Sequence, residues 1–263
     1  MGPVSSPSLA ISVAEAGGVG TIPAFGVPAE KLELLLSDLS PRASGVLAAN
    51  FLTRDIDRDA VREAEAAADA GCDIVVVQGI EAGGHVRGHS ALLPLLSAVL
   101  DVTDVPVLAA GGIGDGRALA AVLAAGADGA RIGTRFIATI ESGAHPEYKG
   151  AVLEARAGST EITGVFANCA LCATSPRARV LRNCIGALAA FPGDTVGTAP
   201  QAGQVAALPA GSGRTPGESF TGCIAAMPMY ASDAVESVVT TESAGQVVAT
   251  LCGEAERRLA HHT

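Results

Sequence analysis

Short apolar runs alternate with helical patterns along residues 1–158, and this alternation constrains the fold more than any other feature. The apolar runs have the length and content of buried parallel strands. A strand followed each time by a helix favours a parallel sheet with helices packed on it. We expect strands at 18–24, 45–51, 73–78, 105–110 and 130–133, and helices at 28–38, 57–70, 91–100, 117–125 and 146–155.

The pattern changes after residue 158, where Gly, Pro, Ala and Ser become frequent. We expect an added strand at 160–166, a long irregular arm at 191–222 and a closing helix best defined at 244–259. The length allows a single domain, because α/β barrels reach this size as one unit. We therefore predict a (β/α) core at 1–158 and a C-terminal extension at 159–263 packed on the same domain.

Chemically active residue types gather directly after the expected strand at 73–78. Residues 78–85 read Gln-Gly-Ile-Glu-Ala-Gly-Gly-His. Glycines let a backbone approach a ligand and adopt positive φ, and the His85 imidazole titrates near neutral pH. Parallel α/β folds place their chemistry at the carboxyl ends of strands. This stretch is the first candidate site.

A second signal lies at the ends of the next two strands. Residues 111–116 read Gly-Gly-Ile-Gly-Asp-Gly and open a helix, and Gly133-Thr134 follows the next strand. Free backbone N–H groups on two neighbouring turns form a phosphate site. The glycines are out of register with the dinucleotide fingerprint G-x-G-x-x-G, so a monophosphate at the last two strands of a barrel fits better. We assign this phosphate to Gly111, Gly112, Gly133 and Thr134.

Taken in order, residues 78–85, 109–113 and 133–136 resemble the nitronate monooxygenase family, whose members are FMN-dependent TIM barrels. The resemblance extends to the N-terminus, to residues 175–183 and to the terminal helix. It implies FMN as cofactor and oxidation of an alkyl nitronate by O₂ to a carbonyl compound and nitrite. The expected partners are therefore a nitronate or nitroalkane and O₂.

The same resemblance implies roles for individual residues. His85 would take the α-proton of a neutral nitroalkane or orient a nitronate, and Gln78 would hydrogen-bond the flavin ring. Gly83 and Gly84 would let the loop pack near that ring, and Asn50 matches a flavin contact. Other readings remain open: His85 could cap a buried turn, and Asn50 could simply end a strand.

Charged residues in and near the two motifs could have structural roles. Glu81 could contact His85 or cap a helix, and Asp115 is expected to cap the helix that follows it. The run 177–182 is interpreted as a charged helix face. Cys169 and Cys172 form a C-x-x-C with no second pair at matching spacing, so we expect no metal site. A redox dithiol is the alternative reading, and scattered reduced thiols are the preferred one.

The chain offers about five strand–helix units where a closed barrel of this type has eight. By resemblance, the family's first strand would precede residue 1, and two further units would lie between residues 51 and 78. One helix suffices to connect adjacent parallel strands. We therefore expect an incomplete or open TIM-barrel-like sheet of about five strands. The strands ending at residues 51 and 78 should be neighbours, and FMN should bind weakly.

Two rival functions remain: an FMN-dependent enoyl-acyl-carrier-protein reductase, and a degenerate family member without activity. Net charge of −10 and the lack of a basic run make a nucleic-acid partner unexpected. No apolar segment has the length of a membrane span, so we expect a cytoplasmic protein. A homodimer would cover an open sheet edge, which is costly to leave exposed.

Overall fold

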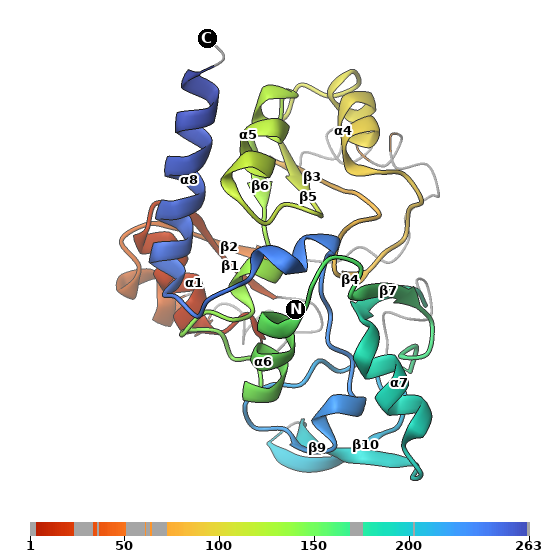
Figure 1. Ribbon diagram of the computed structural model, residues 1–263. Coiled ribbons are helices and arrows are strands. Elements are labelled where there is room, and N and C mark those ends of the chain that lie inside the picture. Colours follow the sequence, from red (N-terminus) through yellow and green to blue (C-terminus); the bar gives the residue numbers. More distant parts are fainter. Residues whose placement is uncertain are drawn as a thin grey trace.

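Two groups of parallel strands form the α/β part of the molecule (Figure 1). In the first, β1 (Val19–Pro23) pairs with β2 (Val46–Asn50). In the second, β5 (Val107–Ala110) lies between β3 (Val75–Gln78) and β6 (Gly129–Arg131). The chain is seen in a computed structural model that describes residues 4–23, 34–35, 37–50, 61, 64, 73–168, 176–201 and 203–261.

Helices cover these strands where the sequence pattern expects them. α4 (Leu92–Leu100) follows β3, and α5 (Gly116–Ala124) connects β5 to β6. α5 packs against the terminal helix α8 (Ala244–Ala260), which also contacts α1 (Pro7–Glu15). A capping box fixes the start of α8: the Ser243 hydroxyl accepts from the Gln246 N–H while the Gln246 side chain accepts from the Ser243 N–H.

Most predicted elements are confirmed. Among residues 1–158, the five expected strands correspond to β1, β2, β3, β5 and β6, and the expected helices at 91–100 and 117–125 correspond to α4 and α5. Beyond residue 158, the strand expected at 160–166 corresponds to β7 (Thr160–Thr163) and the helix expected at 244–259 to α8. The helix expected at 146–155 is α6 (Pro146–Glu154). The helices expected at 28–38 and 57–70 lie largely outside the described residues.

The expectation of one five-stranded sheet is wrong for the strands described. β2 pairs only with β1 among them, and β3 pairs only with β5, so the strands ending near residues 51 and 78 are not neighbours. A single helix is long enough to join adjacent strands, but length limits how far a connection reaches and does not fix which strand lies beside it. The described strands do not close into a barrel.

Two predictions for residues beyond 158 are wrong, because antiparallel strands occupy the expected helix face at 177–182 and much of the expected irregular arm at 191–222. The run 177–182 is not a helix face: β8 (Ala178–Leu181) is a strand between β7 (Thr160–Thr163) and the short β4 (Gly84–His85), and α7 (Arg182–Ala190) starts only after it. Ala178, Val180 and Leu181 are buried, and this apolar set outweighs the charge of the intervening arginine.

The stretch 191–222 is also more regular than expected. β9 (Thr195–Gln201) and β10 (Gln204–Pro209) form an antiparallel pair, and β11 (Thr221–Gly222) adds to the other edge of β9. Small residues hid the alternation, yet they enable the packing: a Cβ on Gly197 would lie 1.8 Å from the Thr221 carbonyl oxygen. Figure 1 shows these strands at the opposite end of the molecule from α5.

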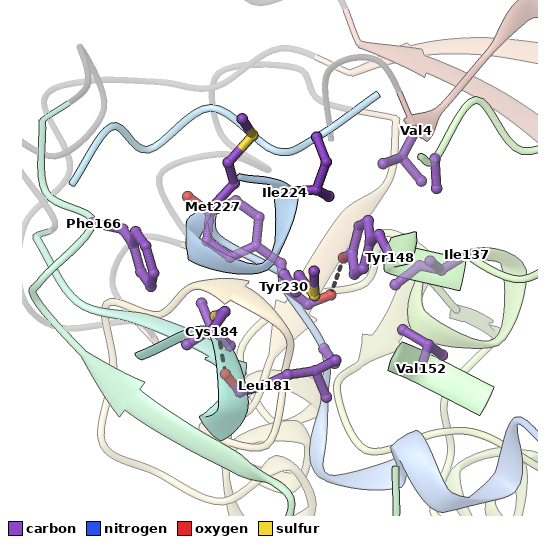
Figure 2. Packing of buried hydrophobic residues seen from close by; sticks show 14 of the residues in the cluster. Val4, Ile137, Tyr148, Val152, Phe166, Leu181, Cys184, Ile224, Met227 and Tyr230 are labelled. Atoms are coloured by element: carbon purple, nitrogen blue, oxygen red, sulfur yellow. Dashed lines mark hydrogen bonds between the residues drawn. The ribbon is translucent and has the colours of Figure 1, made fainter. Parts of the chain in front are cut away.

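The largest apolar cluster takes residues from both sides of residue 158 (Figure 2). Tyr148 and Ile137 meet Leu181, Ile224 and Met227 in it, and all five are buried. Inside the cluster the Tyr148 hydroxyl donates to the Tyr230 carbonyl. A second cluster lies beneath β3 and β5. The division of the chain at residue 158 stays a prediction. Within the described ranges, no helix has both the length and the apolarity to cross a bilayer.

Candidate active site

Hydrogen bonds hold the loop at residues 78–85, one within the loop and one to the neighbouring strand β5. The Gln78 amide Nε2 donates to the His85 carbonyl at 2.9 Å, and the Gly79 N–H donates to the Ala110 carbonyl at 3.0 Å. Gly84 has φ +84°, a conformation that favours glycine, and opens the two-residue β4 strand. The loop therefore has a defined shape that begins at β3 and ends at His85.

His85 lies partly buried at the end of this loop. Its ring centroid is 5.8 Å from that of Tyr230, with the planes inclined by 48°. Burial lowers the pKa of the His85 imidazole, and the nearby positive charge of Arg87 lowers it further. A histidine with a lowered pKa is neutral at physiological pH, which is the form that accepts a proton.

The glycine turn after β5 packs against the same loop. Gly111 and Gly112 have φ +108° and +68°. A Cβ on Gly111 would lie 3.0 Å from the Ala82 nitrogen, and one on Gly112 would lie 3.2 Å from the Glu81 Cβ. The two sequence motifs are therefore in direct contact, as expected, and part of the need for glycine here comes from this close approach.

Backbone donors on the two turns suit an anion. In the part of the chain that the structure describes, the N–H groups of Gly111, Gly112, Gly133 and Thr134 have no hydrogen-bond partner. The Thr134 side chain is already engaged, because its buried hydroxyl accepts from the Ser232 N–H at 2.9 Å. A phosphate at these turns would be held mainly by backbone groups.

The remaining predicted site residues are placed less directly. Gly83 packs against protein, since a Cβ there would lie 2.6 Å from the Ala231 carbonyl carbon. Asn50 ends β2, but its side chain lies outside the described part of the structure. The helix-cap readings are confirmed: Glu81 accepts from the Leu92 N–H at 3.1 Å, and Asp115 accepts from the Ala118 N–H at 2.8 Å. Cys169 and Cys172 also lie outside the described residues.

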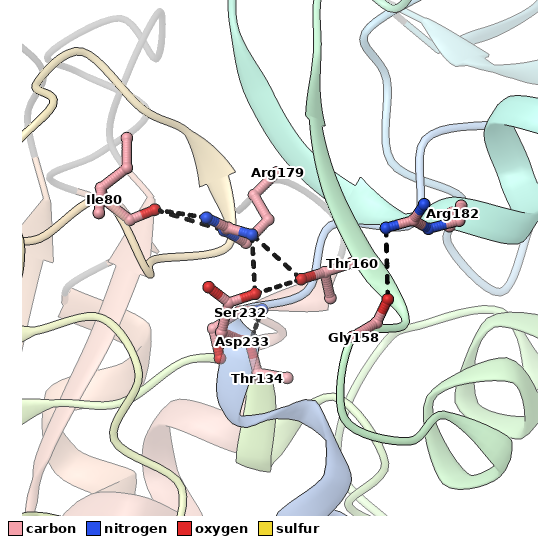
Figure 3. A network of polar contacts seen from close by, with 8 residues as sticks. All are labelled: Ile80, Thr134, Gly158, Thr160, Arg179, Arg182, Ser232 and Asp233. Atoms are coloured by element: carbon pink, nitrogen blue, oxygen red, sulfur yellow. Dashed lines mark hydrogen bonds and ion pairs between the residues drawn. The ribbon is translucent and has the colours of Figure 1, made fainter.

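Sequence reasoning missed Arg179 and the segment 231–233. Arg179 donates to the Ile80 carbonyl from Nε at 3.3 Å and from Nη2 at 3.0 Å, and its Nη1 lies 2.7 Å from an Asp233 carboxylate oxygen (Figure 3). The Asp233 N–H donates to the Glu81 carbonyl at 3.0 Å. The charged run that contains Arg179 was visible in the sequence, but its interpretation as a helix face concealed these contacts. No local signal marks segment 231–233.

Comparison with solved structures finds the same fold. FabK from Thermotoga maritima superposes with a TM-score of 0.73 at 21% identity, covering 99% of this chain and 92% of that one. A nitroalkane oxidase from Streptomyces ansochromogenes gives 0.73 at 23% identity, covering 100% and 95%. These similarities confirm an α/β architecture with parallel strands like that of TIM-barrel enzymes.

Sequence comparison identifies the family. A probable nitronate monooxygenase of Bacillus subtilis (strain 168) is 44% identical over 114 residues, which are 40% of this chain and 33% of that protein. The matched segment thus spans about a third of the length of that curated relative. The family model described as nitronate monooxygenase matches residues 45–254, which is most of the chain. The chain therefore belongs to the nitronate monooxygenase family.

Proposed function

We propose that the protein oxidises alkyl nitronates with O₂, using FMN, to carbonyl compounds and nitrite. The observation that carries this proposal is the contact between two loops of different chemistry. The 78–85 loop presents a histidine with a lowered pKa, and the adjoining Gly111–Gly112 turn presents N–H groups that have no partner among the residues the structure describes. A base beside an anion cradle suits an enzyme that binds a phosphorylated cofactor and an acidic carbon substrate.

Four backbone N–H groups would hold the FMN phosphate, those of Gly111, Gly112, Gly133 and Thr134. One cradle and no dinucleotide fingerprint favour FMN over FAD. For the flavin ring we propose Asn50, Gln78, Gly83 and Gly84. Bound FMN would supply a one-electron acceptor for the nitronate and a route for electrons to O₂. Gln78 Nε2 donates one of its two N–H groups to the His85 carbonyl, so the second N–H and the side-chain oxygen would be available to the flavin ring.

His85 would act on the substrate carbon. In the neutral form it takes the α-proton of a nitroalkane, which leaves the nitronate with its charge on the nitro oxygens. The imidazolium that results carries a positive charge beside this anion and orients it. General-base assistance of this kind is worth about 10²–10⁴-fold in rate. A nitronate supplied preformed would need the orientation but not the proton transfer.

The direct test is an assay of purified protein with added FMN and the nitronate of nitroethane. We expect O₂ uptake accompanied by nitrite and acetaldehyde. A parallel reaction with NAD(P)H and a crotonyl thioester examines the enoyl reductase alternative. Nitronate-independent oxidation of NAD(P)H that requires the thioester would replace the proposed function with that one. Flavin binding without turnover of either substrate would identify a degenerate family member.

A further inference from the structure

We propose that Arg179 is a positioning residue that holds the 80–84 segment in the shape that presents His85. This inference rests on the proposed function only for the role of His85. Arg179 lies on β8, far from the loop in sequence, yet it contacts residues of the 78–85 motif at Ile80 and Gly84. Its importance comes from where its side chain and its backbone meet the loop.

One residue binds both ends of this segment. The Arg179 guanidinium donates two hydrogen bonds to the Ile80 carbonyl, at 3.3 and 3.0 Å. The Arg179 backbone is paired with Gly84 in the β4–β8 ladder, and the next pair is His85 with Ala178. Arg179 therefore holds Ile80 through its side chain and Gly84 through its backbone, and the distance between the two is limited by the length of that side chain.

Burial makes this arrangement specific. The Arg179 side chain is only 11% exposed, so its charge requires partners in fixed positions. Three are present: the Ile80 carbonyl, the Thr160 hydroxyl at 3.2 Å and the Asp233 carboxylate at 2.7 Å. The planar guanidinium reaches all three at once with separate N–H groups, which the point charge of a lysine cannot reproduce.

The same network extends to the phosphate turn (Figure 3). Asp233, held by Arg179, donates its N–H to the Glu81 carbonyl at 3.0 Å. The preceding residue, Ser232, donates its N–H to the Thr134 hydroxyl at 2.9 Å. Arg179 thus stands at the centre of contacts that connect the His85 loop to segment 232–233, and through it to the turn at Thr134.

A matched control lies three residues away. Arg182 is 63% exposed, and its nearest carboxylate, that of Glu161, is 3.4 Å away and 47% exposed. An exposed pair of this kind contributes little to stability. Replacing Arg182 removes a charge of the same sign from the same part of the chain, without touching the 80–84 segment.

The test compares Arg179→Met, Arg179→Lys and Arg182→Met with the unaltered protein by amide hydrogen exchange over residues 79–86. This readout does not depend on turnover. We expect exchange to accelerate about tenfold or more in both Arg179 variants, because the segment opens locally, and to stay unchanged in Arg182→Met. In both Arg179 variants we also expect kcat for neutral nitroalkanes to fall about 10–100-fold, since a small displacement of the base suffices.

The rate with preformed nitronates should change less than about threefold, because that substrate needs no proton transfer. Unchanged exchange in Arg179→Met, or equal rate losses on both substrates, would overturn the proposal. Full protection in Arg179→Lys would also overturn it, because charge alone would then suffice. If Arg179→Met does not fold, Arg179→Lys and Asp233→Asn carry the test, and both should accelerate exchange at residues 80–82. If the unaltered protein oxidises no nitronate, the proposed function fails while the exchange result still decides the role of Arg179.

Discussion

The parallel strands β3, β5 and β6 contribute to the site in a different way from the antiparallel strands β4, β7 and β8. The parallel strands end in turns that offer backbone groups: two glycines with positive φ, and four N–H donors without a partner in the described part of the chain. The antiparallel strands, with segment 231–233, offer side chains such as Arg179 and Asp233 that fix the position of a loop. The proposed phosphate site would come from two short turns, each contiguous in sequence, whereas Arg179 and Asp233 reach the 80–84 segment from distant parts of the chain.

The largest effect is expected from replacing His85, the proposed base. Replacing His85 by Asn should lower turnover of neutral nitroalkanes by about 10²–10⁴-fold, because the amide cannot take the α-proton. Turnover of preformed nitronates should fall far less. Steady-state rates with nitroethane and with its nitronate measure the two losses. Equal losses would assign His85 to substrate binding and not to proton transfer.

A glycine substitution examines the parallel region. Gly111→Ala should weaken FMN binding about tenfold or more, since a side chain at φ +108° costs about 1–3 kcal/mol and its Cβ would lie 3.0 Å from the Ala82 nitrogen. Titration of flavin fluorescence gives the affinity. Gly150→Ala is the control: it lies in α6 with nothing within 4 Å of a new Cβ, and should leave binding unchanged. Unaltered affinity in Gly111→Ala would remove this turn from the cofactor site.

A tyrosine substitution examines the extension. The Tyr230 hydroxyl donates to the Gly213 carbonyl at 2.8 Å, while its ring faces His85. Tyr230→Phe keeps the ring and should lower the free energy of unfolding by about 1 kcal/mol. Urea denaturation measures this loss. Substrate discrimination should not change, because the ring beside His85 is retained, and an altered rate ratio would show that the hydroxyl takes part in the site.

The smallest effect is a pH dependence of stability. The pKa of His85 in the folded protein lies below its ordinary value of 6.5, so the unfolded chain binds this proton more tightly. Stability should therefore fall as the pH drops from 6.5 towards the folded pKa, and level off below it. Denaturation at several pH values, compared with His85→Asn, isolates the contribution. If the unaltered protein gained stability relative to His85→Asn as the pH fell from 6.5, the result would contradict the buried position of the ring.

Sequence reasoning predicts the parallel region well, for physical reasons. Its strands are short apolar runs, its helices have caps such as Asp115, and its turns need glycine for positive φ. The antiparallel strands are predicted only in part. The strand expected at 160–166 corresponds to β7, but the sequence favours a helix face where β8 lies and an irregular arm at residues 195–209, because those strands are defined by partners elsewhere in the chain. The bond from Arg179 to Ile80 joins residues 99 positions apart, and no pattern of local spacing reveals it.

The identity of the bound flavin tests the central claim most directly. The protein, saturated with a mixture of FMN and FAD and freed of unbound flavin, should show flavin absorbance bands. Heat should then release a flavin that migrates as FMN on chromatography. That result is predicted because, in the proposed site, the turns at residues 111–112 and 133–134 would together hold one phosphate. Recovery of FAD, or of no flavin at saturating concentrations, would contradict the assignment of the cradle and the function built on it.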